Sequence, residues 1–120
     1  MAKRTGPTSL VLKKLIADLK SLSTKEKVKL WRRLAEDLSK STRQRRKVNL
    51  YKIEKYTRDG EIAVVPGKVL SEGEINKKLT VAAFKFSDKA REKINKTGKA
   101  ISIQQLMKEN PKGKKVRILG

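Results

Sequence analysis

Residues 79–86 have the sequence LTVAAFKF, and this stretch indicates the fold class of the chain. Side chains of an extended strand point alternately to its two faces, and apolar residues occupy both faces here. A strand with two apolar faces is typical of the interior of a sheet. We therefore expect residues 79–86 to form a strand that is buried on two sides.

The segments around this strand alternate between strand and helix patterns. Ser87 can cap a helix that carries Ala90 and Ile94 and ends at Gly98. A short helix is expected over residues 104–109. The other expected strands cover residues 61–65, residues 68–70 beyond a turn at Pro66-Gly67, residues 100–103 and residues 116–119. Together these elements predict a small α/β unit.

The N-terminal half has the period of helices. Four apolar residues recur at helical spacing and predict a first amphipathic helix: Leu12, Leu15, Ile16 and Leu19. Ser23 and Glu26 have the spacing of a capping box, which predicts the start of a second helix. The buried side of that helix is expected to consist of Val28, Trp31, Leu34, Ala35 and Leu38.

A third short helix is expected with Leu50, Ile53 and Tyr56 on one side and an end at Asp59-Gly60, where glycine can adopt the left-handed conformation. The predicted fold is of the α/β class, with N-terminal helices followed by a small layered unit of short strands and helices. We expect one domain over residues 1–120, with a basic arm at 1–8, a helical part at 9–60 and an α/β part at 61–120.

The charge of the chain predicts a polyanionic partner. The 120 residues include 32 Lys and Arg against 12 Asp and Glu, a formal net charge of +20. So much positive charge on one small domain repels itself, and nucleic acid is the most common partner that neutralises it. A surface of balanced ion pairs is the alternative, but the acidic residues are too few for it.

Several classes of site are excluded by composition. The chain has no cysteine and no histidine. Disulfides, thiol nucleophiles, Ser-His-Asp triads and the usual zinc sites are therefore excluded, and we expect no metal and no cofactor. The longest aliphatic run, residues 62–65, is far too short for a membrane span. We expect an intracellular, soluble protein without a small-molecule substrate.

Residues 40–47, KSTRQRRK, contain five cations and no acid, and we expect them on a loop or an exposed helix start. Arg43, Arg45 and Arg46 can each grip a phosphate or a guanine edge through two hydrogen bonds. Phe84 and Phe86 lie on one face of their predicted strand, and we interpret them as core residues rather than as a platform for stacking bases.

The same region resembles a known protein family. Its most specific part is residues 38–53, where eight residues match the family signature: Leu38, Ser41, Arg45, Arg46, Val48, Asn49, Leu50 and Ile53. Residues 64–70 (VVPGKVL), 79–83 (LTVAA) and 116–118 (VRI) are also similar to it. The family is the large-subunit ribosomal protein L eighteen-e of archaea and eukaryotes, and the short chain resembles its archaeal members.

This resemblance implies a cytoplasmic, structural protein of the large ribosomal subunit that binds ribosomal RNA, has neighbouring ribosomal proteins as partners and is not an enzyme. It also implies a fold shared with the C-terminal part of bacterial ribosomal protein L fifteen. Arg45, Arg46 and Asn49 are carried over as residues of the RNA-facing stretch.

As a hypothesis, three basic segments clamp phosphates of separate RNA segments: the Lys3-Arg4 arm, the 40–47 loop and the 112–115 turn. The full set of expected RNA-binding residues is Lys3, Arg4, Lys13, Lys14, Arg32, Arg33, Lys40, Arg43, Arg45, Arg46, Lys47, Asn49, Lys68, Lys112, Lys114, Lys115 and Arg117.

Two alternatives belong to other classes. The first two helices could form a DNA-binding chromatin or helix-turn-helix protein, although residues 21–24 between them lack the usual glycine. An RNA-modifying or RNA-cleaving enzyme would need a catalytic carboxylate, and the pattern singles out none. Preference for duplex DNA over structured RNA would favour the first alternative.

Overall fold

The computed structural model describes residues 10–39, 46–58 and 60–119. The helices in these ranges are α1 (Leu10–Glu26), α2 (Lys29–Leu38), α3 (Leu50–Tyr56), α4 (Asp88–Thr97) and α5 (Ile103–Glu109). The strands are β1 (Arg46–Asn49), β2 (Ile62–Leu70), β3 (Thr80–Phe86), β4 (Lys99–Ser102) and β5 (Val116–Ile118). Two N-terminal helices precede a succession of strands and helices, so the expected α/β class is confirmed.

Each strand pair of the sheet is parallel, and β2 is central to the pairing. Along one edge β2 pairs with β3, which in turn pairs with β4. Along the other edge β2 pairs with two short strands, because β5 lies opposite residues 62–64 and β1 lies opposite residues 67–70. Two segments that are distant in sequence therefore complete the same edge of β2.

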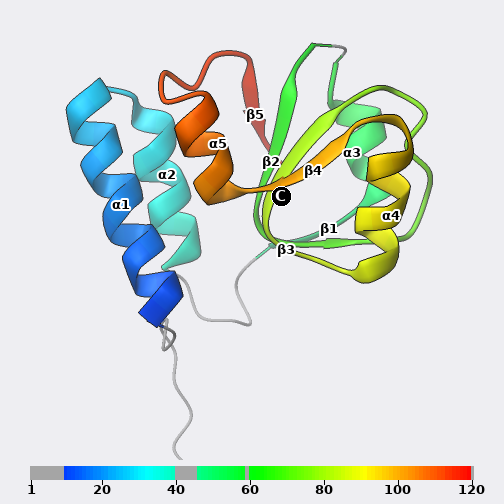
Figure 1. Ribbon diagram of the computed structural model, residues 1–120, viewed down its shortest axis with the longest axis horizontal. Helices are drawn as coiled ribbons and strands as arrows, with labels where there is room; N and C mark the ends of the chain where they lie inside the picture. Colours follow the sequence, from blue (N-terminus) through cyan, green and yellow to red (C-terminus); the bar gives the residue numbers. More distant parts are fainter. Residues whose placement is uncertain (1–9, 40–45, 59, 120) are drawn as a thin grey trace, which may run out of the picture.

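Helices cover both faces of the sheet (Figure 1). The helices α1, α2 and α5 lie on one side, where they pack with Val64, Ala82 and Ile101. The helices α3 and α4 lie on the other side, where they pack with Val65 and Ala83. Adjacent residues of β2 and β3 thus enter different cores, which confirms that β3 is buried on two sides.

Pro66 and Gly67 form an irregularity inside β2, not the turn that we expected. The strand continues through both residues, and its register with β3 shifts between Val65 and Lys68. Proline has no N–H to donate to a neighbouring strand, so sheets tolerate it at edges and bulges. Here Pro66 falls between the pairing with β5, which ends at Val64, and the pairing with β1, which begins at Gly67.

Residues 46–49 form β1, and the first two of them belong to the stretch 40–47 that we expected on a loop or an exposed helix start. Their partners are residues 67–70 of β2. Val48 is buried in the core with α3 and α4. The pairing with β2 and this burial, rather than the local sequence, therefore determine the extended conformation. The expected helical part, residues 9–60, therefore also contributes a strand. Residues 40–45 lie outside the described residues.

The first helix continues through the capping box that we expected to open the second. The helix α1 includes Ser23 and Glu26, and α2 begins at Lys29. Lys27 adopts the left-handed conformation with φ of 58°, and the Val28 N–H donates to the Ser23 carbonyl oxygen at 3.2 Å. This is the hydrogen bond of a Schellman motif, which ends a helix. The Ser23 hydroxyl donates to the Val28 carbonyl oxygen at 2.8 Å instead of capping α2.

The apolar sides predicted for α1 and α2 form the core under these helices. All the predicted residues are buried except Val28, which is half-buried. Trp31 is fully buried, and its Nε1–H donates to the Pro111 carbonyl oxygen at 2.8 Å. This hydrogen bond links the segment after α5 to α2.

The third helix is shorter than expected. It ends at Tyr56 rather than at Asp59-Gly60, of which Asp59 lies outside the described residues. Thr57 ends it by adopting an extended conformation, with φ of −103° and ψ of 123°. Leu50 and Ile53 are buried as predicted, whereas Tyr56 is 48% exposed and does not belong to the core.

The helix after β3 matches its prediction. The Ser87 hydroxyl accepts the Ala90 N–H at 3.2 Å, and the helix ends at Gly98. Phe84 and Phe86 are both half-buried, in agreement with a core role. They do not share one face, however, because Phe84 packs with the α1, α2 and α5 side and Phe86 with the α3 and α4 side. The alternation of β3 is therefore broken near the register shift.

An ion pair holds β5 to the start of β2. The Arg117 guanidinium donates through Nε and Nη2 to the two carboxylate oxygens of Glu61, at 2.9 and 3.1 Å. The Arg58 backbone N–H donates to the same carboxylate at 2.8 Å. The bond from Arg117 is the main cause that lowers the pKa of Glu61 from 4.5 to about 2.

We predict that Glu61→Gln destabilises the protein at neutral pH and that this effect shrinks in acid. The pKa of Glu61 is lowered by folding, so its carboxylate stabilises the fold above pH 4.5 and loses this effect as the pH falls toward 2. Melting temperatures of both proteins across this range measure the difference. A difference that stays constant below pH 4.5 would show that the ion pair does not stabilise β5.

Gly98 lies where α4 meets the start of β3, and a side chain does not fit there. A Cβ would collide with the backbone of Leu79, whose carbonyl oxygen accepts the Lys99 N–H at 3.0 Å. We predict that Gly98→Ala lowers the free energy of unfolding by about 3 kcal/mol. The control is Gly60→Ala, expected to cost about 1 kcal/mol, because Gly60 has φ of 84° but no neighbour within 4 Å. Equal losses in urea denaturation would refute the steric argument.

Candidate nucleic-acid interface

Three lysines lie side by side across β1, β2 and β3. Lys47 pairs in register with Lys68, and Lys68 pairs with Lys85. Residues in register on neighbouring parallel strands project to the same face, with the strands about 4.8 Å apart. All three side chains are exposed, and we call this set the lysine row (Lys47, Lys68 and Lys85).

The irregularity at Pro66-Gly67 is what brings Lys68 beside Lys85. If β3 kept the register that it has with residues 62–65 of β2, Lys68 would lie opposite Phe86. The shift pairs Phe86 with Val69 instead and leaves Lys68 opposite Lys85. Because Val69 and Phe86 pack toward α3 and α4, the apolar pair covers the core and the charged pair has the opposite face.

The lysine row carries positive charge that the described residues do not neutralise. Lys47 and Lys68 form no ion pair with this part of the chain. Lys85 lies over the ring of Phe84, with Nζ 5.7 Å from the ring centre. Like charges at opposed positions of neighbouring strands repel each other. An anionic backbone with regularly spaced charges would relieve this repulsion, and nucleic acid has such a backbone.

Two of the predicted contact residues, Lys47 and Lys68, are therefore brought together. Lys85 was not predicted, although a single lysine within an apolar strand was an available signal. Arg46 precedes Lys47 in β1, so the basic stretch leads into the lysine row. Five predicted residues lie outside the described residues: Lys3, Arg4, Lys40, Arg43 and Arg45.

Two other predicted contact residues have partners inside the protein. Arg117 donates through Nε and Nη2 to the carboxylate of Glu61. The side-chain oxygen of Asn49 accepts the Glu72 N–H at 3.3 Å and so fixes the chain that follows β2. The structure gives these two side chains a role in holding the fold.

The turn after α5 is docked on the end of the α1–α2 hairpin. Lys112 forms an ion pair with Glu26 at 2.6 Å, and this hydrogen bond lowers the pKa of the Glu26 carboxyl. The Asn110 side chain accepts the Lys114 N–H at 3.1 Å and donates to the Lys114 carbonyl oxygen at 2.9 Å. The side chains of Lys114 and Lys115 remain exposed.

The predicted residues of α1 and α2 are also exposed: Lys13, Lys14, Arg32 and Arg33. Lys14 pairs with Asp18 at 3.1 Å, and Arg32 pairs with Glu36 at 3.7 Å. Both pairs join neighbouring turns of a helix surface, where ion pairs contribute little to stability. These cations therefore remain available to a stronger anion.

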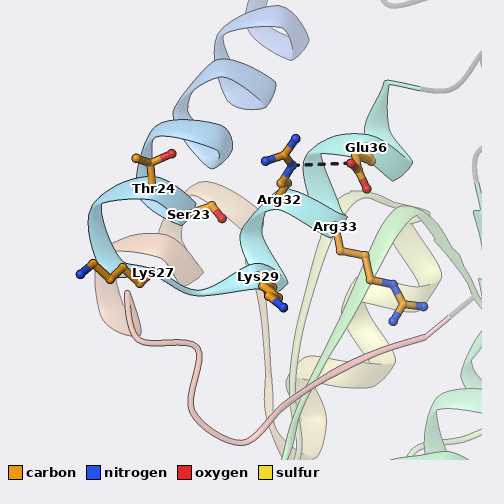
Figure 2. Close-up of a pocket in the computed structure, with 7 residues that line it drawn as sticks. All are labelled: Ser23, Thr24, Lys27, Lys29, Arg32, Arg33 and Glu36. Carbon is orange, nitrogen blue, oxygen red and sulfur yellow. Dashed lines mark ion pairs between the residues drawn. The ribbon is translucent and has the colours of Figure 1, made fainter.

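Arg32 and Arg33 belong to a cleft beside the turn between α1 and α2, with a volume of 610 Å³ (Figure 2). We call it the α1–α2 cleft, and its lining residues are Ser23, Thr24, Lys27, Lys29, Arg32, Arg33 and Glu36. Lys27 and Lys29 were not predicted as contact residues. Both residues lie where α1 ends and α2 begins. The apparent capping box at Ser23 and Glu26 placed this boundary too early in the sequence.

The geometry does not fit a DNA-binding helix-turn-helix. The helices α1 and α2 lie side by side in opposite directions (Figure 1), whereas the two helices of a DNA-binding helix-turn-helix cross at about 90–120°. In the described ranges, no cluster of three or more acidic side chains could hold a metal ion. None of the helices found there has the length and apolarity needed to cross a membrane.

Known proteins match this chain over almost its whole length. The family described as "Ribosomal protein 60S L18 and 50S L18e" matches residues 2–120. The large ribosomal subunit protein eL18 of Sulfurisphaera tokodaii is 45% identical, over 99% of this chain and 98% of the relative. The proteins of the same name from Thermoplasma acidophilum and Methanopyrus kandleri are 46% and 44% identical, over 96% of this chain in both cases and over 97% and 95% of the relatives. The chain therefore belongs to the L18 and L18e family of ribosomal proteins, a family of large-subunit proteins and not of enzymes.

Proposed function

We propose that this protein is a structural component of the large ribosomal subunit in the cytoplasm, where it binds large-subunit ribosomal RNA through phosphate contacts and supports translation. The match of residues 2–120 to the family carries this proposal. The net charge of +20 agrees with an RNA partner. Neighbouring ribosomal proteins are its other expected partners.

We assign the lysine row to the RNA backbone. A lysine ammonium is a compact charge on a flexible stem, so lysines on three adjacent strands can each reach a phosphate of one RNA strand. Contacts of this kind position a protein on nucleic acid but carry no sequence information. Arg43, Arg45 and Arg46 are further RNA contacts that we propose for the basic stretch.

The sheet holds the lysine row in a fixed arrangement. Its three residues lie on strands that are backed by the core with α3 and α4. The backbone that carries these charges needs no ordering when RNA binds, so the entropic cost of the complex is limited to that of the lysine side chains. The protein is then suited to hold RNA segments whose phosphates otherwise repel each other.

We predict that the combined change Lys47→Gln, Lys68→Gln and Lys85→Gln weakens binding to transcribed large-subunit ribosomal RNA from the same source. Loss of three phosphate contacts should lower the affinity about 30-fold or more near 0.1 M salt. The slope of log affinity against log salt should fall by roughly 2–3. Filter binding over a series of salt concentrations measures both quantities.

The matched control is Lys78→Gln, Lys89→Gln and Lys96→Gln, which removes the same charge from exposed positions outside the row. The row variant should melt no lower than the parent protein, because repulsion between its lysines is removed. Equal losses of affinity in the two variants would contradict the role of the lysine row. Failure of the parent protein to bind the RNA would contradict the proposed function itself.

A further inference from the structure

We infer that the α1–α2 cleft is a second RNA-backbone site, which holds a segment of ribosomal RNA other than the segment at the lysine row. This inference rests on the proposed function and adds a surface to it. In Figure 1 the turn between α1 and α2 lies at the upper left, whereas β1 lies below the centre and to the right. One continuous stretch of RNA backbone at the lysine row does not cover this turn, so the protein would join two segments.

The charge of the cleft favours an anionic ligand. Lys27, Lys29 and Arg33 form no ion pair with the described residues. Arg32 is paired with Glu36 at 3.7 Å, a long contact on an exposed helix surface. A second hollow of 430 Å³ adjoins the cleft at Thr24, and it adds the cations Lys20 and Lys25.

The other lining residues favour RNA over a protein partner. The buried centres of protein interfaces are rich in aromatic and large apolar side chains, and the lining of the cleft has neither. The hydroxyl groups of Ser23 and Thr24 donate to backbone carbonyl oxygens at 2.8 and 3.2 Å. The cations are therefore the groups left to bind a ligand, as in a site for phosphates.

Lys27 gives an independent argument for a ligand. It occupies the left-handed position that ends α1, with φ of 58°. Glycine is the usual residue at such a position because it has no Cβ, and lysine is strained there. A cation near the end of a helix is favourable, but Lys25 already supplies one in the last turn of α1. The strained lysine at the edge of the cleft is thus explained better by a bound anion than by stability.

The docked turn after α5 extends this basic end. Gly113 lies directly against the side chain of Leu30, and the ion pair from Lys112 to Glu26 fixes the turn to α1. The exposed Lys114 and Lys115 directly follow this docked glycine. Figure 2 shows Lys27 and Lys29 projecting from the α1–α2 turn, on the side where this segment passes.

The first test is Lys27→Gly, which removes one charge and also relieves the left-handed strain. The melting temperature should rise by roughly 3–5 °C. The affinity for large-subunit ribosomal RNA should fall about 3- to 10-fold near 0.1 M salt. A rise in melting temperature with unchanged affinity, or with no greater loss than in the control Lys96→Gln, would overturn the inference.

The second test locates the RNA segments. Hydroxyl-radical footprinting of the large-subunit ribosomal RNA compares the parent protein, the lysine-row variant and the combined change Lys29→Gln and Arg33→Gln. Each variant should lose protection at a different RNA segment. Loss at the same segment in both, an unchanged footprint for the cleft variant, or cross-linking of the cleft to a protein would overturn the inference. These results leave the proposed function intact, whereas absence of any footprint for the parent protein would refute it.

Discussion

The strand β2 must be paired along both of its edges, and the rest of the structure depends on this constraint. The strand is buried on two sides, so its unpaired backbone groups would have no water to bind. One edge is satisfied by β3, and the other is shared by β5 and β1. The last strand of the chain and the strand that follows the helical hairpin therefore have to meet at β2. Pro66, which has no N–H to donate, lies in the gap between them.

This arrangement also determines where the charge lies. Apolar residues of β2 and β3 enter the cores on both faces, and the register shift moves Lys68 next to Lys85. β1 then adds Lys47 to the same row. The path of the chain from α5 to β5 passes the hairpin, where Trp31 holds the Pro111 carbonyl oxygen.

The parts of the fold that sequence predicts well are those set by local chemistry. The apolar spacing of α1, the cap at Ser87 and the two-sided burial of β3 each follow from a few neighbouring residues. The strand β1 does not, because its partner residues in β2 are 21 positions away and Val48 is its one buried apolar residue. The spacing of Ser23 and Glu26 fits a capping box and equally fits the last turn of a helix that ends before the left-handed Lys27.

The sequence predicts that the candidate site is a basic, RNA-binding surface, but it does not predict which side chains lie together there. Charge and the family resemblance indicated RNA, and Lys47 and Lys68 were among the expected contact residues. The place of Lys85 depends on a register shift that no sequence pattern reveals. Arg117 and Asn49 appeared available in sequence, yet Glu61 and the chain after β2 engage them. Whether a polar side chain is available to RNA therefore depends on residues that are far away in sequence and come close only in the folded protein.

Sedimentation of native cell extract on a sucrose gradient, with and without RNase, tests most directly whether this protein is part of the large subunit. Mass spectrometry of the fractions follows the chain itself. A structural protein held by ribosomal RNA is predicted to migrate with the large subunit, to remain there after a moderate salt wash and to be released by RNase. Migration with the nucleoid, or as free protein at the top of the gradient, would contradict a ribosomal role.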